Sequence, residues 1–186
     1  GLGYLTEVNL NEMTDAMERI LKSDFRTEKR MMLDIAITRR GDKAGEGTVL
    51  NEVVINRDNL SRIVELETAV NGRHLATFKA DGLIIATPTG STAYSLSAGG
   101  PIIFPEQNAM ILNPICAHTL TNRPVVLPED VAVQVVLWTK EQGATLTLDG
   151  QVSYTLASGD TISVRKSSYV TTLVASPHRD YLEILR

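Results

Sequence analysis

The stretch from Val64 to Ala86 reads VELETAVNGRHLATFKADGLIIA and decides the fold more clearly than any other part of the sequence. Residues 64–70 alternate between apolar or β-branched and polar side chains, which is typical of a strand with one buried face. Asn71-Gly72 then separates this run from the next, and Asn-Gly in that position is the strongest short-range signal for a β-hairpin. The segment from Gly82 to Ala86 is continuously apolar, which predicts a central strand.

The same kind of pattern extends on both sides of this stretch. Upstream, the alternation predicts strands at 31–38 and 49–55, with residues 41–47 as an exposed hairpin loop. Downstream, Asp149-Gly150 predicts a second tight hairpin turn. The downstream strands are predicted at 125–127, 131–138, 145–148, 152–156, 161–165 and 170–174. About ten short strands separated by turns predict a mainly β chain folded as a β-sandwich, and they exclude a doubly wound nucleotide-binding fold.

Two helices are expected beside these strands. Near the N-terminus, apolar residues recur at helical spacing, and Asn9 with Glu12 resembles a capping box. Those apolar residues are Leu10, Met13, Met17, Ile20 and Leu21. A second, short helix is expected after the Thr87–Thr92 loop, TPTGST, because Gly99-Gly100-Pro101 ends the helix-compatible stretch there.

Composition excludes several classes of function. The chain has 186 residues, of which 43% are hydrophobic, and this suits one domain with a core. No apolar run reaches the roughly 20 residues of a membrane span, and a single cysteine, Cys116, fits a reducing compartment, so a cytoplasmic protein is expected. A net charge of -4 with 5% aromatic residues disfavours nucleic acid as a partner. His74, His118 and His178 have no metal-ligand spacing with Cys116, so no metal site is predicted.

One segment carries a candidate site. A buried strand leads into a loop rich in Thr, Ser and Gly, from which a helix starts at about Thr92. Free N–H groups and the dipole at a helix start attract phosphate oxygens. Gly90 would let a ligand approach the backbone, and Tyr94 offers a ring or a hydroxyl to a base or a ribose. From the residues alone, an ordinary capped turn is the favoured explanation of this loop, because Ser and Thr caps are common.

The string TPTGSTAY at Thr87–Tyr94, continued by SLSAGGP, closely resembles a motif of the NAD kinase family. Shorter pieces agree with this resemblance in order and approximate spacing. They are GLGYL from Gly1, Asn51-Glu52, Arg123-Pro124 and LDGQ at Leu148–Gln151. The resemblance implies that residues 1–186 form the C-terminal NAD-binding domain. It also implies that the α/β domain with a Gly-Gly-Asp-Gly motif, whose aspartate deprotonates the ribose 2′-hydroxyl, is absent from this chain.

The resemblance implies an activity in which the terminal phosphate of ATP or polyphosphate passes to the 2′-hydroxyl of the NAD adenosine ribose, giving NADP. Mg²⁺ would accompany the donor phosphates. No catalytic residue is expected within this chain, which should be inactive alone. The implied NAD-binding residues are Asn51, Glu52, Arg62, Lys79, Asp81, Thr92, Ala93, Tyr94, Ser95, Leu96, Ser97, Asp149 and Gln151.

Within that set, the resemblance assigns separate parts of the dinucleotide. Asn51 and Glu52 would contact the ribose and adenine, and Gln151 the adenosine side. Asp81 would contact the nicotinamide carboxamide near a junction with a neighbouring subunit, so a homodimer or homotetramer is expected. Arg62 and Lys79 would lie near the phosphate added to the product.

Two other functions remain open at this point. A lipid kinase of the diacylglycerol kinase type shares the two-domain plan, although the TPTGSTAY string and the lack of an interfacial amphipathic helix argue against it. The other alternative is a non-catalytic β-sandwich that binds a dinucleotide or serves oligomer assembly.

Overall fold

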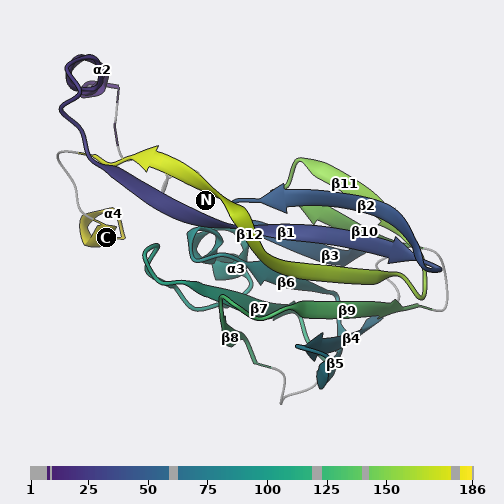
Figure 1. Ribbon diagram of the computed structural model, residues 1–186. Coiled ribbons are helices and arrows are strands. Elements are labelled where there is room, and N and C mark those ends of the chain that lie inside the picture. Colours follow the sequence, from purple (N-terminus) through teal and green to yellow (C-terminus); the bar gives the residue numbers. More distant parts are fainter. Residues whose placement is uncertain are drawn as a thin grey trace.

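Two six-stranded antiparallel sheets make up the body of the chain in the computed structural model, which describes residues 8, 10–58, 63–118, 123–139, 143–176 and 181–185 (Figure 1). The first sheet has the order β2-β1-β12-β9-β4-β5 and the second has the order β11-β10-β3-β6-β7-β8. The predicted mainly β fold is confirmed.

The strands have the following bounds. In the first sheet they are β1 (Thr27–Arg39), β2 (Asp42–Val49), β4 (Val64–Val70), β5 (Arg73–Ala80), β9 (Val133–Trp138) and β12 (Thr161–Val174). In the second sheet they are β3 (Glu52–Arg57), β6 (Gly82–Ala86), β7 (Ala109–Ile115), β8 (Val125–Pro128), β10 (Ala144–Leu148) and β11 (Val152–Leu156). The helical segments are α2 (Met13–Leu21), the 3-10 turn η1 (Thr89–Thr92), α3 (Tyr94–Ser97) and α4 (Tyr181–Ile184).

The main core lies between the sheets, where alternate residues of each strand point inward. Strand β6 shows why its sequence is apolar throughout: Leu83 and Ile85 belong to the core between the sheets, whereas Ile84 belongs to a smaller cluster on the outer face of the second sheet. Ala98 and Ile103, from the segment after α3, pack against that smaller cluster. The outer face of β6 is therefore covered, which is the face where the predicted site lies.

Both predicted two-residue hairpin turns are present. Asn71 and Gly72 have φ of 49° and 75°, and Asp149 and Gly150 have φ of 47° and 68°, as a type I′ turn requires. A third such turn was not predicted. Arg40 and Gly41 also have positive φ, of 53° and 92°.

This third turn corrects the prediction of an exposed loop at 41–47, because β2 already begins at Asp42. The glycines inside β2 leave room for side chains of the second sheet. A Cβ added at Gly45 would meet the ring of Tyr154, and one at Gly47 would meet the side chain of Leu148. The two glycines are there for packing between the sheets.

Three further strand predictions were wrong in their limits. The predicted strand 49–55 is divided, since β2 ends at Val49 and β3 begins at Glu52. The predicted strands 161–165 and 170–174 are one strand, β12, which pairs with β1 along its length with a register shift between Met31 and Leu33. Strand β7 was not predicted, although all seven of its residues are buried.

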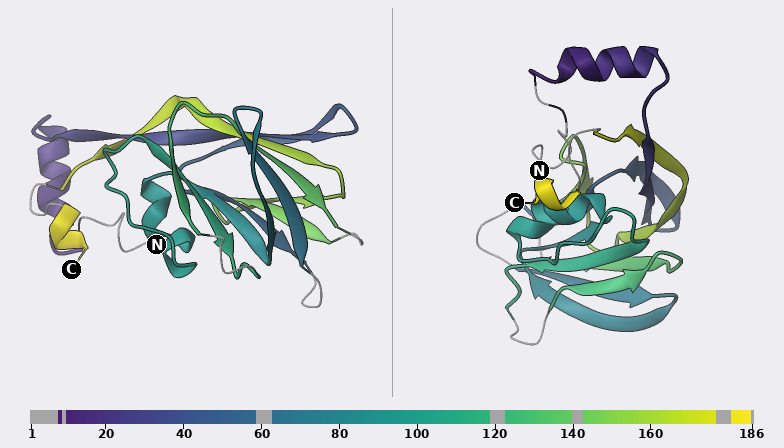
Figure 2. Two further views of the ribbon diagram at one scale, coloured as in Figure 1. Left: turned by 90° about the horizontal axis from the view of Figure 1, so that it is seen from below. Right: turned by 90° about the vertical axis from the view of Figure 1, so that its left-hand side faces the viewer.

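Helix α2 stands apart from the two sheets, beyond the ends of β1 and β12 (Figure 2). It begins at Met13, later than predicted, and Glu12 at the N-cap makes no side-chain capping hydrogen bond. Asn9, the predicted cap, lies outside the described residues. No residue of α2 is buried, so its apolar face is exposed. None of the helices in the described ranges is long and apolar enough to cross a membrane.

Candidate functional site

The candidate site lies on the outer face of the second sheet, where η1 and α3 follow β6. Glu52, the first residue of β3, shares this face with Val54, because alternate residues of a strand point the same way. Its cross-strand partner is Ala86, the last residue before the Thr87–Thr92 loop. The pairing therefore brings the predicted Asn51-Glu52 pair beside the predicted loop.

The turn at Leu50 and Asn51 is held from two sides. On one side, the Asp149 carboxylate accepts hydrogen bonds from the backbone N–H groups of Leu50 (2.8 Å), Asn51 (2.8 Å) and Glu52 (3.0 Å). On the other side, the Thr87 N–H donates to the Asn51 carbonyl (2.8 Å) and the Thr87 hydroxyl donates to the Leu50 carbonyl (2.6 Å). Three segments that are distant in sequence therefore meet at this turn.

Gly90 has a different role from the one predicted. A Cβ added at this position would overlap the backbone O, C and Cα atoms of Asn51. The space that the sequence analysis reserved for a ligand is occupied by the chain itself. Glycine is needed at position 90 so that η1 can pack on the turn that carries Asn51 and Glu52.

The expected phosphate cradle at the helix start is also not formed by these groups. The N–H groups of Gly90, Ser91, Ala93 and Leu96 already donate within the loop, at 3.1, 3.1, 2.9 and 3.2 Å. The reason is that η1 and α3 are single turns of four residues each, and these four N–H groups make turn hydrogen bonds within this segment. Phosphate binding by the N–H groups of Gly90, Ser91, Ala93 and Leu96 therefore gains no support.

Hydroxyl groups of this segment divide between the interior and the surface. The Thr92 hydroxyl donates to the Thr89 carbonyl (3.3 Å), and the Ser91 hydroxyl donates to the Pro88 carbonyl (2.6 Å). Ser95 is buried, whereas Tyr94 is 41% exposed and Ser97 is also exposed. The side chains able to meet a ligand on this segment are therefore those of Tyr94 and Ser97.

Asn113, which the sequence analysis did not identify, ties α3 to the sheet. Its side-chain amide donates to the Ser95 carbonyl at 2.9 Å and lies 3.4 Å from the Ser95 hydroxyl. Gly100 completes this junction, since a Cβ there would come within 2.7 Å of the Asn113 amide nitrogen. Asn113 thereby sets where Tyr94 and Ser97 lie on the outer face.

Glu52 is electrostatically unusual. It is only 7% exposed, and its Oε2 atom has no hydrogen-bond partner within the described part of the chain. Burial, and secondly the negative charge of Asp149, raise the pKa of Glu52 to about 7. The site therefore contains a buried acceptor that is free to accept hydrogen bonds and that changes its charge near neutral pH.

Asp81 and Lys79 form a second group, which lies where β5 of the first sheet leads into β6 of the second. Asp81 forms an ion pair with Arg57, whose guanidinium nitrogen lies 3.0 Å from the Asp81 Oδ1 atom. The Nε2 atom of His118 lies 3.9 Å from the same oxygen. Lys79 pairs with Glu65 at 3.1 Å on the surface. Five residue steps separate Asp81 from Ala86 beside Glu52, which is about 16 Å at the usual strand rise. The structure therefore divides the predicted residues into two groups.

The remaining predicted residues can now be placed. Arg62 lies outside the described residues. Gln151 is exposed at the β10–β11 hairpin next to Asp149. Ala93 and Leu96 are half-buried in the loop and in α3. Among the described residues, no hydrogen bond is made by the side chains of Asn51, Tyr94, Ser97 or Gln151, so these groups are available to a ligand.

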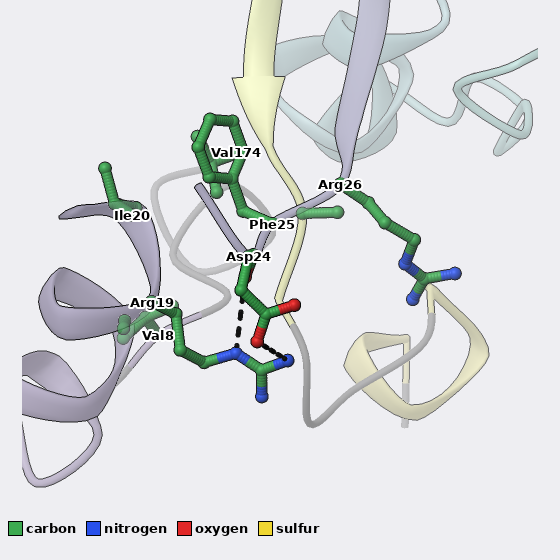
Figure 3. Close-up of a pocket in the computed structure, with 9 residues that line it drawn as sticks. Val8, Arg19, Ile20, Asp24, Phe25, Arg26 and Val174 are labelled. Carbon is green, nitrogen blue, oxygen red and sulfur yellow. Dashed lines mark hydrogen bonds and ion pairs between the residues drawn. The ribbon is translucent and has the colours of Figure 1, made fainter. Parts of the chain in front are cut away.

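A separate cavity of about 350 Å³ lies between α2 and the outer ends of β1 and β12 (Figure 3). In its wall, Arg19 forms an ion pair with Asp24 at 3.1 Å, beside Phe25 and Val174. None of the predicted site residues lines it. Within the described ranges, no group of three His, Cys, Asp or Glu side chains gathers in a way that could hold a metal ion.

Comparison with known proteins decides the family. Residues 50–176 match the model of the ATP-NAD kinase C-terminal domain, and this range contains Asn51, Glu52, the 87–97 segment and Asp149.

The chain belongs to the ATP-NAD kinase C-terminal domain family.

Individual relatives agree with this assignment. The chain is 51% identical over 186 residues to the NAD kinase of Citrifermentans bemidjiense and 50% identical over 185 residues to that of Geobacter sulfurreducens. In both cases all of this chain is matched, but it spans only 65% of the relative. The chain therefore spans a little less than two thirds of the length of these relatives.

Solved structures show the same fold. Yeast NADH kinase complexed with NADH superposes with a TM-score of 0.91 at 28% identity, covering 98% of this chain and 54% of that one. An NAD kinase from Archaeoglobus fulgidus in complex with ATP superposes with a TM-score of 0.72 at 23% identity, covering 90% and 61%. The second similarity supports the ATP-NAD kinase C-terminal domain fold alone.

Proposed function

We propose that this chain is the acceptor-binding domain of an NAD kinase, which transfers the terminal phosphate of ATP or polyphosphate to the 2′-hydroxyl of the NAD adenosine ribose. The observation that carries the proposal is the buried, unpartnered carboxylate of Glu52, held beside the 87–97 segment on the face where the family motif lies. A carboxylate in this position suits a polyol such as ribose, because it accepts hydrogen bonds from hydroxyl groups.

The neighbouring side chains complete the proposed acceptor site. The Asn51 amide can both donate to and accept from the ribose and the adenine, and Gln151 can do the same on the adenosine side. Tyr94 offers a ring to stack on, and Ser97 a hydroxyl. We propose that Thr92, Ala93, Ser95 and Leu96 shape the site mainly through their positions, since two of their side chains already make internal hydrogen bonds.

The second group would meet the rest of the dinucleotide. Asp81 is proposed to contact the nicotinamide carboxamide, and Lys79 and Arg62 to lie near the phosphate added to NADP. From the family resemblance, we propose that a neighbouring subunit completes the nicotinamide end of the site, with Asp81 near that junction. A homodimer or homotetramer follows. Light scattering checks this, and a monomer at high protein concentration would contradict it.

The phosphate donor is proposed to bring its own metal ion. Mg²⁺ prefers oxygen ligands and is commonly bound through substrate phosphates with few protein carboxylates. When bound, the ion would neutralise charge on the donor phosphates.

The base that deprotonates the ribose hydroxyl is proposed to lie outside these 186 residues. The test is an NADP-formation assay on the purified chain with ATP, Mg²⁺ and NAD. We expect no practical turnover. Loss of the base and loss of donor positioning should each lower the rate of phosphoryl transfer by several factors of ten. Turnover of roughly 1–100 per second would contradict this. It would point to Glu52 as a base inside the chain, since a pKa of about 7 suits that role.

The family match favours this function over the two alternatives. A lipid kinase of the diacylglycerol kinase type is not favoured, because the relatives are named NAD kinases. A non-catalytic dinucleotide-binding module describes how the isolated chain should behave in the assay above. It is separated from the kinase proposal by restoring the longer protein, which should then form NADP.

A further inference from the structure

The β10–β11 hairpin is joined to the turn at Leu50 and Asn51 through the side chain of Asp149. We propose that Asp149 is a positioning residue, which holds Asn51 and Glu52 in their binding geometry and does not itself touch the dinucleotide. This inference rests on the proposed function, because it concerns the same acceptor site. It differs from the expectation, taken from the resemblance, that Asp149 contacts the ligand.

Both oxygens of the Asp149 carboxylate accept hydrogen bonds from the backbone. Oδ2 accepts from the Leu50 N–H at 2.8 Å, and Oδ1 accepts from the N–H groups of Asn51 and Glu52 at 2.8 and 3.0 Å. Three successive N–H groups converging on one anion form an anion-binding concavity made of backbone. The anion in this case is supplied by the protein, so the carboxylate is directed at the chain and away from the ligand.

The Asp149 carboxylate holds the start of β3 in place. The Asp149 N–H donates to the Glu52 carbonyl at 3.0 Å, so the hairpin is hydrogen-bonded to the start of β3 through its backbone as well as through the Asp149 side chain. Thr87 binds the carbonyls of Leu50 and Asn51 from the opposite side. These hydrogen bonds restrain the backbone at 50–52 from both sides, and the backbone sets the directions in which the Asn51 and Glu52 side chains leave it.

Among the residues that tolerate this turn conformation, only aspartate supplies an acceptor to all three N–H groups. The residue has φ of 47°, which aspartate and asparagine tolerate better than most residues. Asparagine has the same shape but replaces one acceptor oxygen by an NH₂ group, which would face a backbone N–H. Glycine keeps the turn and removes the acceptor entirely. Asp149→Asn and Asp149→Gly therefore remove the anion while preserving the hairpin.

The experiment compares NAD binding by the wild-type chain, Asp149→Asn and Asp149→Gly by calorimetry across pH. A matched control is Asn71→Gly, because Asn71 holds the same position in a type I′ turn (φ 49°) and its side chain also accepts a backbone N–H, that of Ala132 (2.8 Å), but it lies in the other sheet. We expect NAD affinity to fall at least about tenfold in both Asp149 variants and to stay within about twofold in the control. In Asp149→Asn the pH at which binding is half-maximal should also fall, because a neighbouring negative charge is lost.

A measurement without any variant accompanies this one, so that a misfolded variant does not leave the proposal undecided. In the wild-type chain, ¹³C carboxyl resonances are followed as NAD is added. The Glu52 carboxyl should shift and the Asp149 carboxyl should not. A shift at Asp149 as large as that at Glu52, or unchanged NAD affinity in folded Asp149→Asn, would overturn the positioning role. If the wild-type chain does not bind NAD at all, the proposed function itself fails.

Discussion

At the scale of single residues, Glu52 places a carboxylate where an apolar side chain would cost less. Its neighbours on the outer face, such as Val54 and Ile84, are apolar and buried, and the charge that acts on it most strongly, that of Asp149, is also negative. Burying an unpaired charge is unfavourable, so the residue resists ionisation. We infer that this position is kept acidic for binding, at the expense of stability.

This conflict makes a prediction about pH. The pKa of Glu52 is raised in the folded chain to about 7, so its contribution to stability is fully present below the unfolded-state pKa and is lost as pH rises through about 7. We expect Glu52→Gln to be more stable than wild type by about 1–3 kcal/mol at pH 8, with little difference at pH 5. Urea denaturation at the two pH values measures this. An equal difference at both would contradict the assigned charge.

The glycine at position 90 makes a second prediction at this scale. We expect Gly90→Ala to destabilise the chain by about 2–3 kcal/mol, because the new methyl group would overlap the Asn51 backbone, which cannot rotate away. Gly47→Ala is the matched control, since its Cβ would meet only the end of the Leu148 side chain, and about 1 kcal/mol or less is expected. Equal losses in thermal or urea unfolding would show that the turn at Asn51 is not rigid.

Not every functional residue could be found from the sequence. Asn51, Glu52 and Tyr94 were identified because they belong to short strings that resemble a family. Thr87 and Asn113 act through hydrogen bonds to residues far away in the chain, which periodicity does not reveal. Their roles become visible only once β3, β6 and β7 are placed side by side.

At the scale of elements, turn chemistry explains which predictions succeeded. Asn71-Gly72 and Asp149-Gly150 were identified because these dipeptides favour positive φ at both positions. The turn at Arg40-Gly41 was missed, because arginine seldom occupies the left-handed region. Strand β7 was missed because Asn113 and Pro114 interrupt its apolar run, and proline is unusual inside a sheet.

Helix α2 is expected to open more readily than the strands of the two sheets. It has nine residues and none is buried, so few tertiary contacts hold it, and an isolated helix of this length is marginal. We expect its amide hydrogens to exchange within seconds to minutes in the isolated chain, whereas those of β6, with all five residues buried, exchange orders of magnitude more slowly. Hydrogen-exchange mass spectrometry measures both. Protection of α2 equal to that of β6 would mean that its apolar face is covered.

At the scale of the whole molecule, the sandwich explains how the site is assembled. Strand β3 lies between β10 and β6 in the second sheet. The turn at Asn51, the hairpin at Asp149 and the loop after Ala86 therefore meet at the same end of these three strands. Alternation along the sequence predicts strands but not which strands pair when they are a hundred residues apart. The mainly β fold could therefore be predicted, while the meeting of these three segments could not.

We propose above all that this end of the second sheet binds the acceptor dinucleotide. Titration calorimetry of the 186-residue chain with NAD, and with ATP in parallel, tests it most directly. We expect NAD to bind weakly, with a Kd of about 0.1–1 mM, and ATP to give no comparable heat, because the acceptor groups around Glu52 are present. Absence of NAD binding at millimolar concentration, or tighter binding of ATP than of NAD, would contradict the account.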